Sequence, residues 1–272
     1  MAQYTIDDLI YLMSRLRDPE TGCPWDLKQS FATIVPHTLE EAYEVADAIE
    51  REDWGHLNDE LGDLLFQVIF YAQLGSEEQR FDFSSIVSNL ITKLVRRHPH
   101  VFPGGTLQSN SADTPLTDEE IKRNWEAIKQ QERNAKGESG DSRILDDVPR
   151  ALPALSRAAK LQKRAAQVGF DWDDAESVLD KIEEELAELR EAIRAGDKAA
   201  VADEMGDMIF AQVNLARHLG VNPEDAVRGT NHKFERRFSH VEDCVRESGK
   251  TWQEFSLDQL DAFWDQAKAK GL

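Results

Sequence analysis

Apolar residues along this chain recur at the spacing of helices. One stripe with a 3.6-residue period comprises Leu57, Leu61, Leu64, Leu65, Val68 and Ala72. The second half has two such stripes, formed by Ile182, Leu186, Leu189 and Ile193 and by Val201, Met205, Met208, Ile209 and Ala216. The alternation of apolar and polar residues that is typical of strands is hard to find anywhere. The pattern predicts an all-α fold with several helices in each half, packed as antiparallel bundles.

Polar positions indicate that the two halves are copies of one pattern. The sequence ELGDLLF at 60–66 matches EMGDMIF at 204–210, and LEEAYE at 39–44 matches EEELAE at 183–188. A single offset of 144 relates four pairs of acidic residues, namely Glu41 and Glu185, Glu44 and Glu188, Glu60 and Glu204, and Asp63 and Asp207. A constant offset over several matching segments indicates a duplicated domain.

Composition locates the connection between the copies. Residues 103–115 are rich in Gly, Ser, Asn, Thr and Pro, and a short helical pattern follows over 118–133. We therefore expect an N-terminal domain over residues 1–103, a linker with a helical segment over 104–149, and a C-terminal domain over 150–272. These segments carry net charges of −10, −4 and −6. Of the two domains, the C-terminal one carries the smaller negative net charge and therefore repels an anionic substrate less.

The overall charge and the cysteines exclude several classes of protein. A net charge of −20 repels phosphate backbones, so we expect no nucleic-acid partner. No apolar run approaches the roughly 18–20 residues that a membrane span needs, and residues 1–13 lack the basic start of a signal peptide. Cys23 and Cys244 lie 221 positions apart, which suggests neither a zinc site nor a disulfide framework. We expect a cytoplasmic protein without a membrane partner.

Four acidic residues of the second half are placed to converge. Glu185 and Glu188 are three apart on one predicted helix, as are Glu204 and Asp207 on the next, so each pair lies on one helix face. The connection 195–197 is short enough for an antiparallel hairpin, which brings the two pairs face to face. Carboxylates that converge without basic partners require a cation. Oxygen ligands without nearby Cys or His favour Mg²⁺, with Mn²⁺ as a substitute, over zinc.

Two other interpretations of the carboxylates carry less weight. A single Glu-rich helix is usually a solvated face, but recurrence of all four positions at one offset argues against this reading. A di-iron bundle requires Glu-x-x-His on facing helices. Here the fourth ligand is Asp207, and His218 falls outside that spacing.

Basic residues on a later helix complete the candidate site. Lys233, Arg236 and Arg237 follow the spacing i, i+3, i+4 and form a compact patch that suits phosphate groups. Salt bridges to Glu235 or Glu242 are the structural alternative for the same patch.

These residues resemble the MazG family of nucleoside triphosphate pyrophosphohydrolases in its long two-domain bacterial form. The hallmark of that family, Glu-x-x-Glu followed by Glu-x-x-Asp, occurs in both halves. Further matching segments are RDPE at 17–20, CPWD at 23–26, RRHPHVF at 96–102 and VGFDW at 168–172. The carboxylate motif alone is shared with dUTPase-like and phosphoribosyl-ATP pyrophosphohydrolases, so these flanks give the resemblance its specificity.

The resemblance implies two tandem MazG-like helical domains, homodimers, and Mg²⁺-dependent hydrolysis of NTPs and dNTPs, ATP among them, to the monophosphate and pyrophosphate. It implies metal ligation by Glu185, Glu188, Glu204 and Asp207. It places Glu184 beside the substrate as the candidate base that orients water, with the ligand Glu185 as the alternative. It implies a triphosphate clamp formed by Lys181, Lys233, Arg236 and Arg237, and a nucleoside contact made by Trp264.

The resemblance also attributes catalysis to the C-terminal copy, and the residues supply a partial reason. The N-terminal copy keeps its carboxylates together with Lys93, Arg96 and Arg97. However, His37 stands where the C-terminal copy has Lys181, and Phe70 stands where that copy has Asn214. We therefore expect the N-terminal copy to be weakly active or structural and to support the dimer.

Two alternative functions remain beside the broad pyrophosphohydrolase. One is a helical module that senses nucleotides or docks a partner without turnover, although simple binding does not demand four clustered carboxylates. The other is an enzyme of narrow specificity that acts on dUTP or phosphoribosyl-ATP. The residues do not reveal a base preference or a sugar preference.

Overall fold

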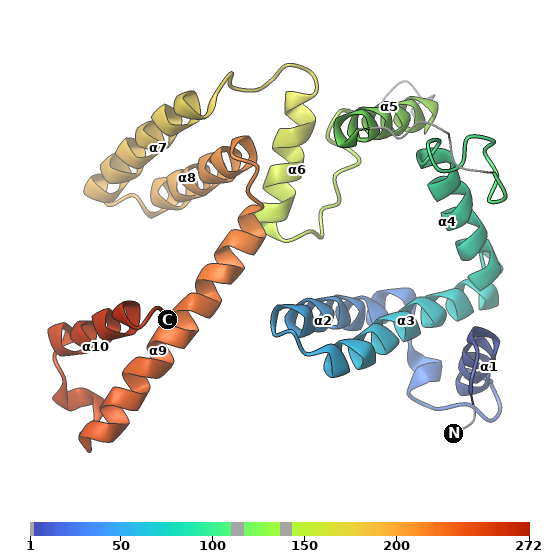
Figure 1. Cartoon of the computed structure of the whole chain (residues 1–272), viewed down its shortest axis with the longest axis horizontal. Coiled ribbons are helices and arrows are strands. Elements are labelled where there is room, and N and C mark those ends of the chain that lie inside the picture. The colour runs from blue at the N-terminus through green and yellow to red at the C-terminus, as the bar shows by residue number, and fades with distance from the viewer. Residues whose placement is uncertain (1–2, 110–116, 137–142) are drawn as a thin grey trace. The chain divides into compact units, whose positions relative to one another are not determined.

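The computed structural model of the chain describes residues 3–109, 117–136 and 143–272, with the side chains of 117–136 described in part. Its longer helices are α1 (Ile6–Leu16), α2 (Phe31–Glu50), α3 (Trp54–Glu77), α4 (Phe83–Arg97), α5 (Asp118–Lys136), α6 (Ala154–Ala166), α7 (Ala175–Ala195), α8 (Lys198–His218), α9 (Pro223–Ser248) and α10 (Leu257–Ala269). Two short 3₁₀ turns, η1 (Asp26–Lys28) and η2 (Trp252–Glu254), complete the described elements (Figure 1). The described residues form no strand, which confirms the all-α prediction. None of the described helices is both long enough and apolar enough to cross a membrane.

The chain divides into two compact units, residues 1–136 and residues 137–272. The division falls inside the predicted linker of 104–149, and helix α5 belongs to the N-terminal unit. Parts of that predicted linker, residues 110–116 and 137–142, lie outside the described residues.

In the N-terminal unit, α2 and α3 lie side by side, and α1 packs against α3 (Figure 1). A cluster of buried apolar side chains lies where these helices meet and comprises Met13, Ile34, Ile69, Phe70 and Leu74. Helix α4 follows α3 and packs against it. The core therefore occupies the end of the α2–α3 pair that α1 covers.

In the C-terminal unit, a tight connection joins α7 and α8 into a hairpin. Gly196 ends α7 at φ 70°, a left-handed conformation that glycine adopts without a Cβ clash. Asp197 then caps α8, because its carboxylate accepts hydrogen bonds from the backbone N–H of Ala199 at 2.9 Å and of Ala200 at 3.2 Å. Helix α6 packs on α8 and α9, and α10 packs on α9. The hairpin fixes which residues of α7 face which residues of α8.

The last helix of each unit extends the internal repeat. Thr117 directly precedes α5 and Ser256 directly precedes α10, and the side chain of each accepts a hydrogen bond from the backbone N–H three residues later. The same offset of 139 relates Trp125 to Trp264. Trp125 lies against His98 at the end of α4, with ring centroids 6.2 Å apart, and Trp264 lies 5.7 Å from the Arg237 guanidinium on α9. Helix α5 is therefore the N-terminal counterpart of α10.

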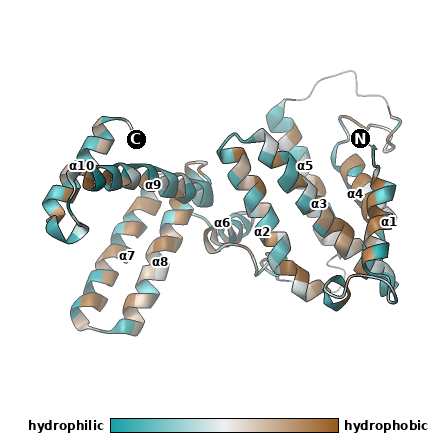
Figure 2. Ribbon diagram, turned by 90° about the horizontal axis from the view of Figure 1, so that it is seen from below, coloured by the Kyte–Doolittle hydropathy of each residue, from teal (hydrophilic) through white to brown (hydrophobic). Residues whose placement is uncertain are grey.

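Parts of the predicted apolar stripes are exposed within the single chain. Ile193 is 58% exposed, and Leu61, Leu65, Met205 and Ile209 are exposed as well. Figure 2 shows apolar bands along α7 and α8 that continue beyond the seam between them. The helices associate mainly as pairs, so each helix covers only the face that its neighbour contacts. The remaining apolar face has equivalent positions in both units, since Leu61 and Leu65 correspond to Met205 and Ile209.

We expect Met13→Ala to lower the free energy of unfolding of the N-terminal unit by about 2–5 kcal/mol, because it leaves a cavity in the core. Met13 is 0% exposed, whereas its neighbour Leu12 is 48% exposed. Leu12→Ala is therefore the matched control, with an expected change of about 0.5 kcal/mol or less. Urea unfolding followed by circular dichroism measures both. Equal losses for the two variants would contradict the assignment of Met13 to the core.

Candidate active site

Helix α7 buries a carboxylate beside a lysine. Glu185 is 5% exposed, and Lys181 one turn earlier places its Nζ 2.8 Å from Glu185 Oε1. The same Nζ lies 3.0 Å from Glu184 Oε1, on a side chain that is largely exposed. Hydrogen bonds to Glu185 and then to Glu184 raise the pKa of Lys181 well above its usual value. Lys181 is therefore a fixed cation between the two glutamates.

Three carboxylates from α7 and α8 meet in the seam of the hairpin. Glu185, Glu188 and Glu204 each offer one oxygen, and these oxygens all lie within 4.8 Å of one another. Asp207 lies outside this group of three but one turn after Glu204 on the same helix face. The structure thus brings together three of the four predicted ligands and leaves the fourth beside them.

The electrostatics of this cluster favour a bound cation. Burial raises the pKa of Glu204 above its ordinary value, and repulsion from Glu188, Glu185, Asp207 and Asp203 raises it further. In an octahedral Mg²⁺ site with Mg–O distances of about 2.1 Å, opposite oxygens are about 4.2 Å apart. The three oxygens lie within 4.8 Å of one another, which leaves room for such an arrangement around one ion. The donor set and its spacing therefore fit a divalent cation that prefers oxygen ligands.

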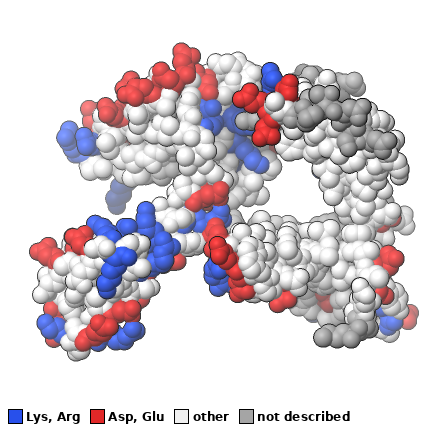
Figure 3. Space-filling model, in the orientation of Figure 1, with Lys and Arg blue, Asp and Glu red and all other residues white. Residues whose placement is uncertain are grey.

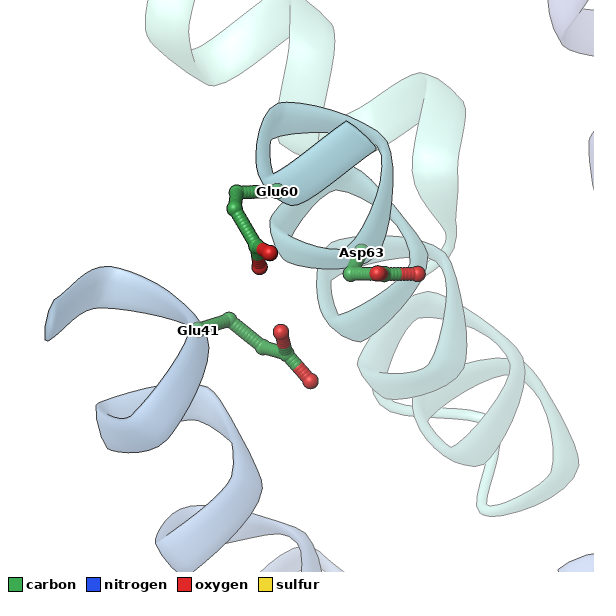
Figure 4. Close-up of side chains that lie close together, drawn as sticks. All are labelled: Glu41, Glu60 and Asp63. Atoms are coloured by element: carbon green, nitrogen blue, oxygen red, sulfur yellow. The ribbon is translucent and has the colours of Figure 1, made fainter. Parts of the chain in front are cut away.

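The N-terminal unit has a similar cluster whose third member differs, since Asp63 joins it in place of Glu44, the counterpart of Glu188. Oxygens of Glu41, Glu60 and Asp63 lie within 4.8 Å of one another, and Figure 4 shows Glu41 on one helix facing Glu60 and Asp63 on the next. Burial, followed by repulsion from Asp63, Glu44 and Glu60, raises the pKa of Glu41. Glu60 also has a raised pKa, caused first by burial and next by Glu44.

The groups that contact these N-terminal carboxylates carry less fixed charge. Gln67 Nε2 lies 3.4 Å from Glu41, and His56 Nε2 lies 3.0 Å from Glu60 Oε1. His37, which occupies the position of Lys181, lies 3.7 Å from Glu40 Oε2. A histidine is charged only when it is protonated, so no permanent cation contacts this cluster among the described residues.

The two seams differ again beyond the carboxylates. In the C-terminal unit, Asn214 is 2% exposed, and its Oδ1 accepts hydrogen bonds from Arg217 Nε at 2.9 Å and Nη2 at 2.6 Å. Arg217 also pairs with Asp171, and His218 Nε2 lies 3.1 Å from the same carboxylate. The position of Asn214 is taken by Phe70 in the N-terminal unit, where it belongs to the apolar core. The C-terminal seam therefore stays polar where the N-terminal seam is filled.

The basic triad predicted from the sequence lies apart from the carboxylates. Lys233 and Arg236 are exposed on α9, and Arg237 donates from Nε to the main-chain oxygen of Leu272 at 2.7 Å. Trp264 packs against Phe234, with ring centroids 5.2 Å apart. Figure 3 shows basic side chains gathered over α9 and acidic side chains along the edge of the α7–α8 hairpin. No hydrogen bond or ion pair joins the triad to the cluster within residues 143–272, the described part of this unit.

The counterpart of the triad in the N-terminal unit has a partner that sequence reasoning missed. Arg96 and Arg97 at the end of α4 both bind Glu132 of α5. The shared spacing of Trp125 and Trp264 was a partial signal, because it aligns α5 with α10, but the contact of Glu132 with the arginines is seen only in the structure.

Comparison with known proteins finds the same repeat that the structure shows. The model of the MazG nucleotide pyrophosphohydrolase domain matches residues 29–102 and again residues 173–242. A nucleoside triphosphate pyrophosphohydrolase of Escherichia coli K12 is 51% identical over 98% of this chain and 98% of its own. The nucleoside triphosphate pyrophosphohydrolase/pyrophosphatase MazG of Thermotoga maritima is 41% identical over 96% of this chain and 95% of its own. A crystal structure of a MazG-related protein from Thermotoga maritima is 26% identical, with a TM-score of 0.38, and covers 46% of this chain and 98% of its own.

We expect Glu204→Gln to raise the thermal unfolding midpoint of the metal-free protein at pH 7. Because the pKa of Glu204 is raised in the folded state, its charged form opposes folding at pH values above its ordinary value of 4.5. The difference from wild type should shrink as the pH falls through that value, where the group is protonated in both states. Calorimetry in EDTA measures the shift. With excess Mg²⁺ the wild type should gain more stability than the variant.

Glu191→Gln is the control, since Glu191 is an exposed acid on α7 outside the cluster. An equal increase in this control would assign the effect to net charge alone. A lower midpoint for Glu204→Gln in EDTA would contradict the repulsive cluster.

Proposed function

The chain belongs to the MazG family of nucleotide pyrophosphohydrolases, and we propose that it hydrolyses nucleoside triphosphates, ribo and deoxy alike, to the monophosphate and pyrophosphate at the seam of α7 and α8. The observation that carries the proposal is the cluster of three carboxylates, one of them the buried Glu185, beside Lys181. The names of the two relatives that match nearly the whole chain agree with this activity.

We propose Mg²⁺ as the cation, held by Glu185, Glu188 and Glu204 with Asp207 beside them. When bound, a divalent cation neutralises the polyphosphate and stabilises the charge that develops on the leaving pyrophosphate. The protein holds three carboxylates in one seam before substrate arrives, so little reorganisation is needed during the reaction. Mn²⁺ has the same preference for oxygen ligands and is the expected substitute.

Lys181 and Glu184 supply the remaining groups at the seam. Lys181 offsets the charge of Glu185 and keeps its Nζ beside the cluster, where it can donate to a phosphate oxygen. Glu184 is exposed and bound only to Lys181 among its described neighbours, so its carboxylate can accept a proton from water when a phosphate takes over the lysine. We therefore propose Glu184 as the base.

We propose that the working form is a homodimer. The α7–α8 hairpin has an exposed apolar face formed by Leu186, Ile193, Met205 and Ile209. Such a face favours contact with another apolar surface, and an equivalent face exists in the N-terminal unit. A second copy offers the same face, as a two-fold dimer requires. Lys233, Arg236 and Arg237 stand clear of the carboxylates in the single chain, and dimer formation or the bound triphosphate would bring them to the site.

The substrate and the cysteines support a cytoplasmic location. Nucleoside triphosphate pools are intracellular, and Cys23 and Cys244 are both free thiols.

Glu185→Gln should reduce pyrophosphate release from NTPs and dNTPs by about 100-fold or more, because it removes a buried ligand. Glu41→Gln, the equivalent change in the N-terminal unit, should reduce it by less than about threefold, because only the C-terminal seam has the fixed cation Lys181. EDTA should abolish release, and Mg²⁺ should restore it. The assay measures pyrophosphate and orthophosphate separately over a panel of nucleotides.

A larger loss for Glu41→Gln would move the active site to the N-terminal unit. Metal-independent nucleotide binding without turnover would favour a sensing module. Turnover of dUTP or phosphoribosyl-ATP alone would favour an enzyme of narrow specificity.

Ile193→Lys should weaken the dimer by at least about tenfold, because a charge would be buried in an apolar interface. Ala195→Lys adds the same charge at an exposed small residue of the same helix and is the control. Light scattering and sedimentation over a range of concentrations measure the mass. A wild-type protein with the mass of a single chain at all concentrations would contradict the dimer.

A further inference from the structure

Helix α5 is fixed to the end of α4 by one carboxylate. Arg96 Nε donates to Glu132 Oε1 over 2.9 Å, and Arg97 Nε lies 3.2 Å from both oxygens of Glu132. Each arginine makes a further, shorter contact through Nη2. Hydrogen bonding from Arg97, opposed by burial and assisted by Arg96, lowers the pKa of Glu132 to about 2. A single side chain therefore occupies donors of two guanidinium groups.

The C-terminal unit has the same arginines without this carboxylate. Arg236 and Arg237 correspond to Arg96 and Arg97, and the offset that relates Trp125 to Trp264 places Gly271 at the position of Glu132. Arg236 makes no ion pair within residues 143–272, and Arg237 instead meets a main-chain oxygen. The two copies therefore differ in whether an anionic side chain sits on the arginine pair.

A pair of guanidinium groups that converges on a carboxylate also suits the oxygens of a phosphate. Lys93, one turn before Arg96 on the same helix face, is exposed and makes no ion pair among residues 3–109 and 117–136. We propose that Arg96, Arg97 and Lys93 form an oxyanion site in the N-terminal unit that Glu132 keeps closed, and that a polyphosphate chain competes with Glu132 for it. The proposal concerns binding alone and goes beyond the proposed catalysis.

Glu132, the side chain that closes the site, is part of the same chain as the arginines, so a ligand competes with a tethered anion. Glu132 is held near the arginines by α5 at a high effective concentration, so a ligand must displace it rather than fill open space. Trp125 of α5 lies against His98 at the end of α4, beside the same junction. Displacement of Glu132 therefore weakens the packing of α5 on α4. Binding of polyphosphate and docking of α5 thus oppose each other.

The first test counts bound tripolyphosphate on the full chain in EDTA by titration calorimetry. Glu132→Gln should bind one more tripolyphosphate per chain than wild type, with an affinity at the new site at least about tenfold higher than wild type shows there. Glu119→Gln removes the same charge from an exposed position of α5 and should leave the count unchanged. The double variant Glu132→Gln/Arg97→Gln should lose the added site.

The second test uses the unaltered protein, so it holds even if a variant fails to fold. Excess tripolyphosphate should raise amide hydrogen exchange in α5 several-fold, while sulfate at equal ionic strength should not. A non-hydrolysable nucleoside triphosphate that acts like tripolyphosphate would extend the site to nucleotides, whereas an effect of tripolyphosphate alone would restrict it to inorganic chains. An unchanged count in Glu132→Gln together with unchanged exchange in α5 would overturn the proposal. Neither test uses turnover, so a failure of the catalytic proposal leaves both readouts intact.

Discussion

Repulsion among carboxylates held in one seam is the interaction on which the rest of each unit depends. Glu185 is buried between two helices with Glu188 and Glu204 within a few ångströms, and both burial and like charge disfavour that arrangement. The connection through Gly196 and Asp197 holds the helices in register despite this cost. The hairpin therefore concentrates negative charge at one place, and the surrounding residues determine which positive groups balance that charge.

The two units balance this negative charge with different groups. Lys181 gives the C-terminal cluster a fixed cation, whereas the N-terminal cluster has His56 and Gln67, neither of which is permanently charged. Beyond the cluster, Phe70 fills the N-terminal seam as part of the core, while Asn214 keeps the C-terminal seam polar. The same position is thus apolar and part of the core in one copy, and polar and hydrogen-bonded in the other.

The sequence was sufficient for the helices and the carboxylates because both are periodic. The 3.6-residue stripes predict helices without reference to a partner, and the second copy provides an internal check on Glu185 and Glu204. Which stripe is covered depends on what packs against it, so the exposure of Ile193 could not be derived from the same pattern. The contact between Arg97 and Glu132 spans 35 residues and follows no period, so only the structure shows it.

The duplicated arginine pair shows how one geometry serves two purposes. A guanidinium group presents parallel donors, and these match a carboxylate as well as a phosphate. In the N-terminal unit a glutamate of the chain takes that place, and the pair fastens α5 to α4. In the C-terminal unit the corresponding position is Gly271, and Arg236 stays exposed. A single acidic side chain thus converts a geometry suited to phosphate into a structural contact, without altering the arginines or the helix that carries them.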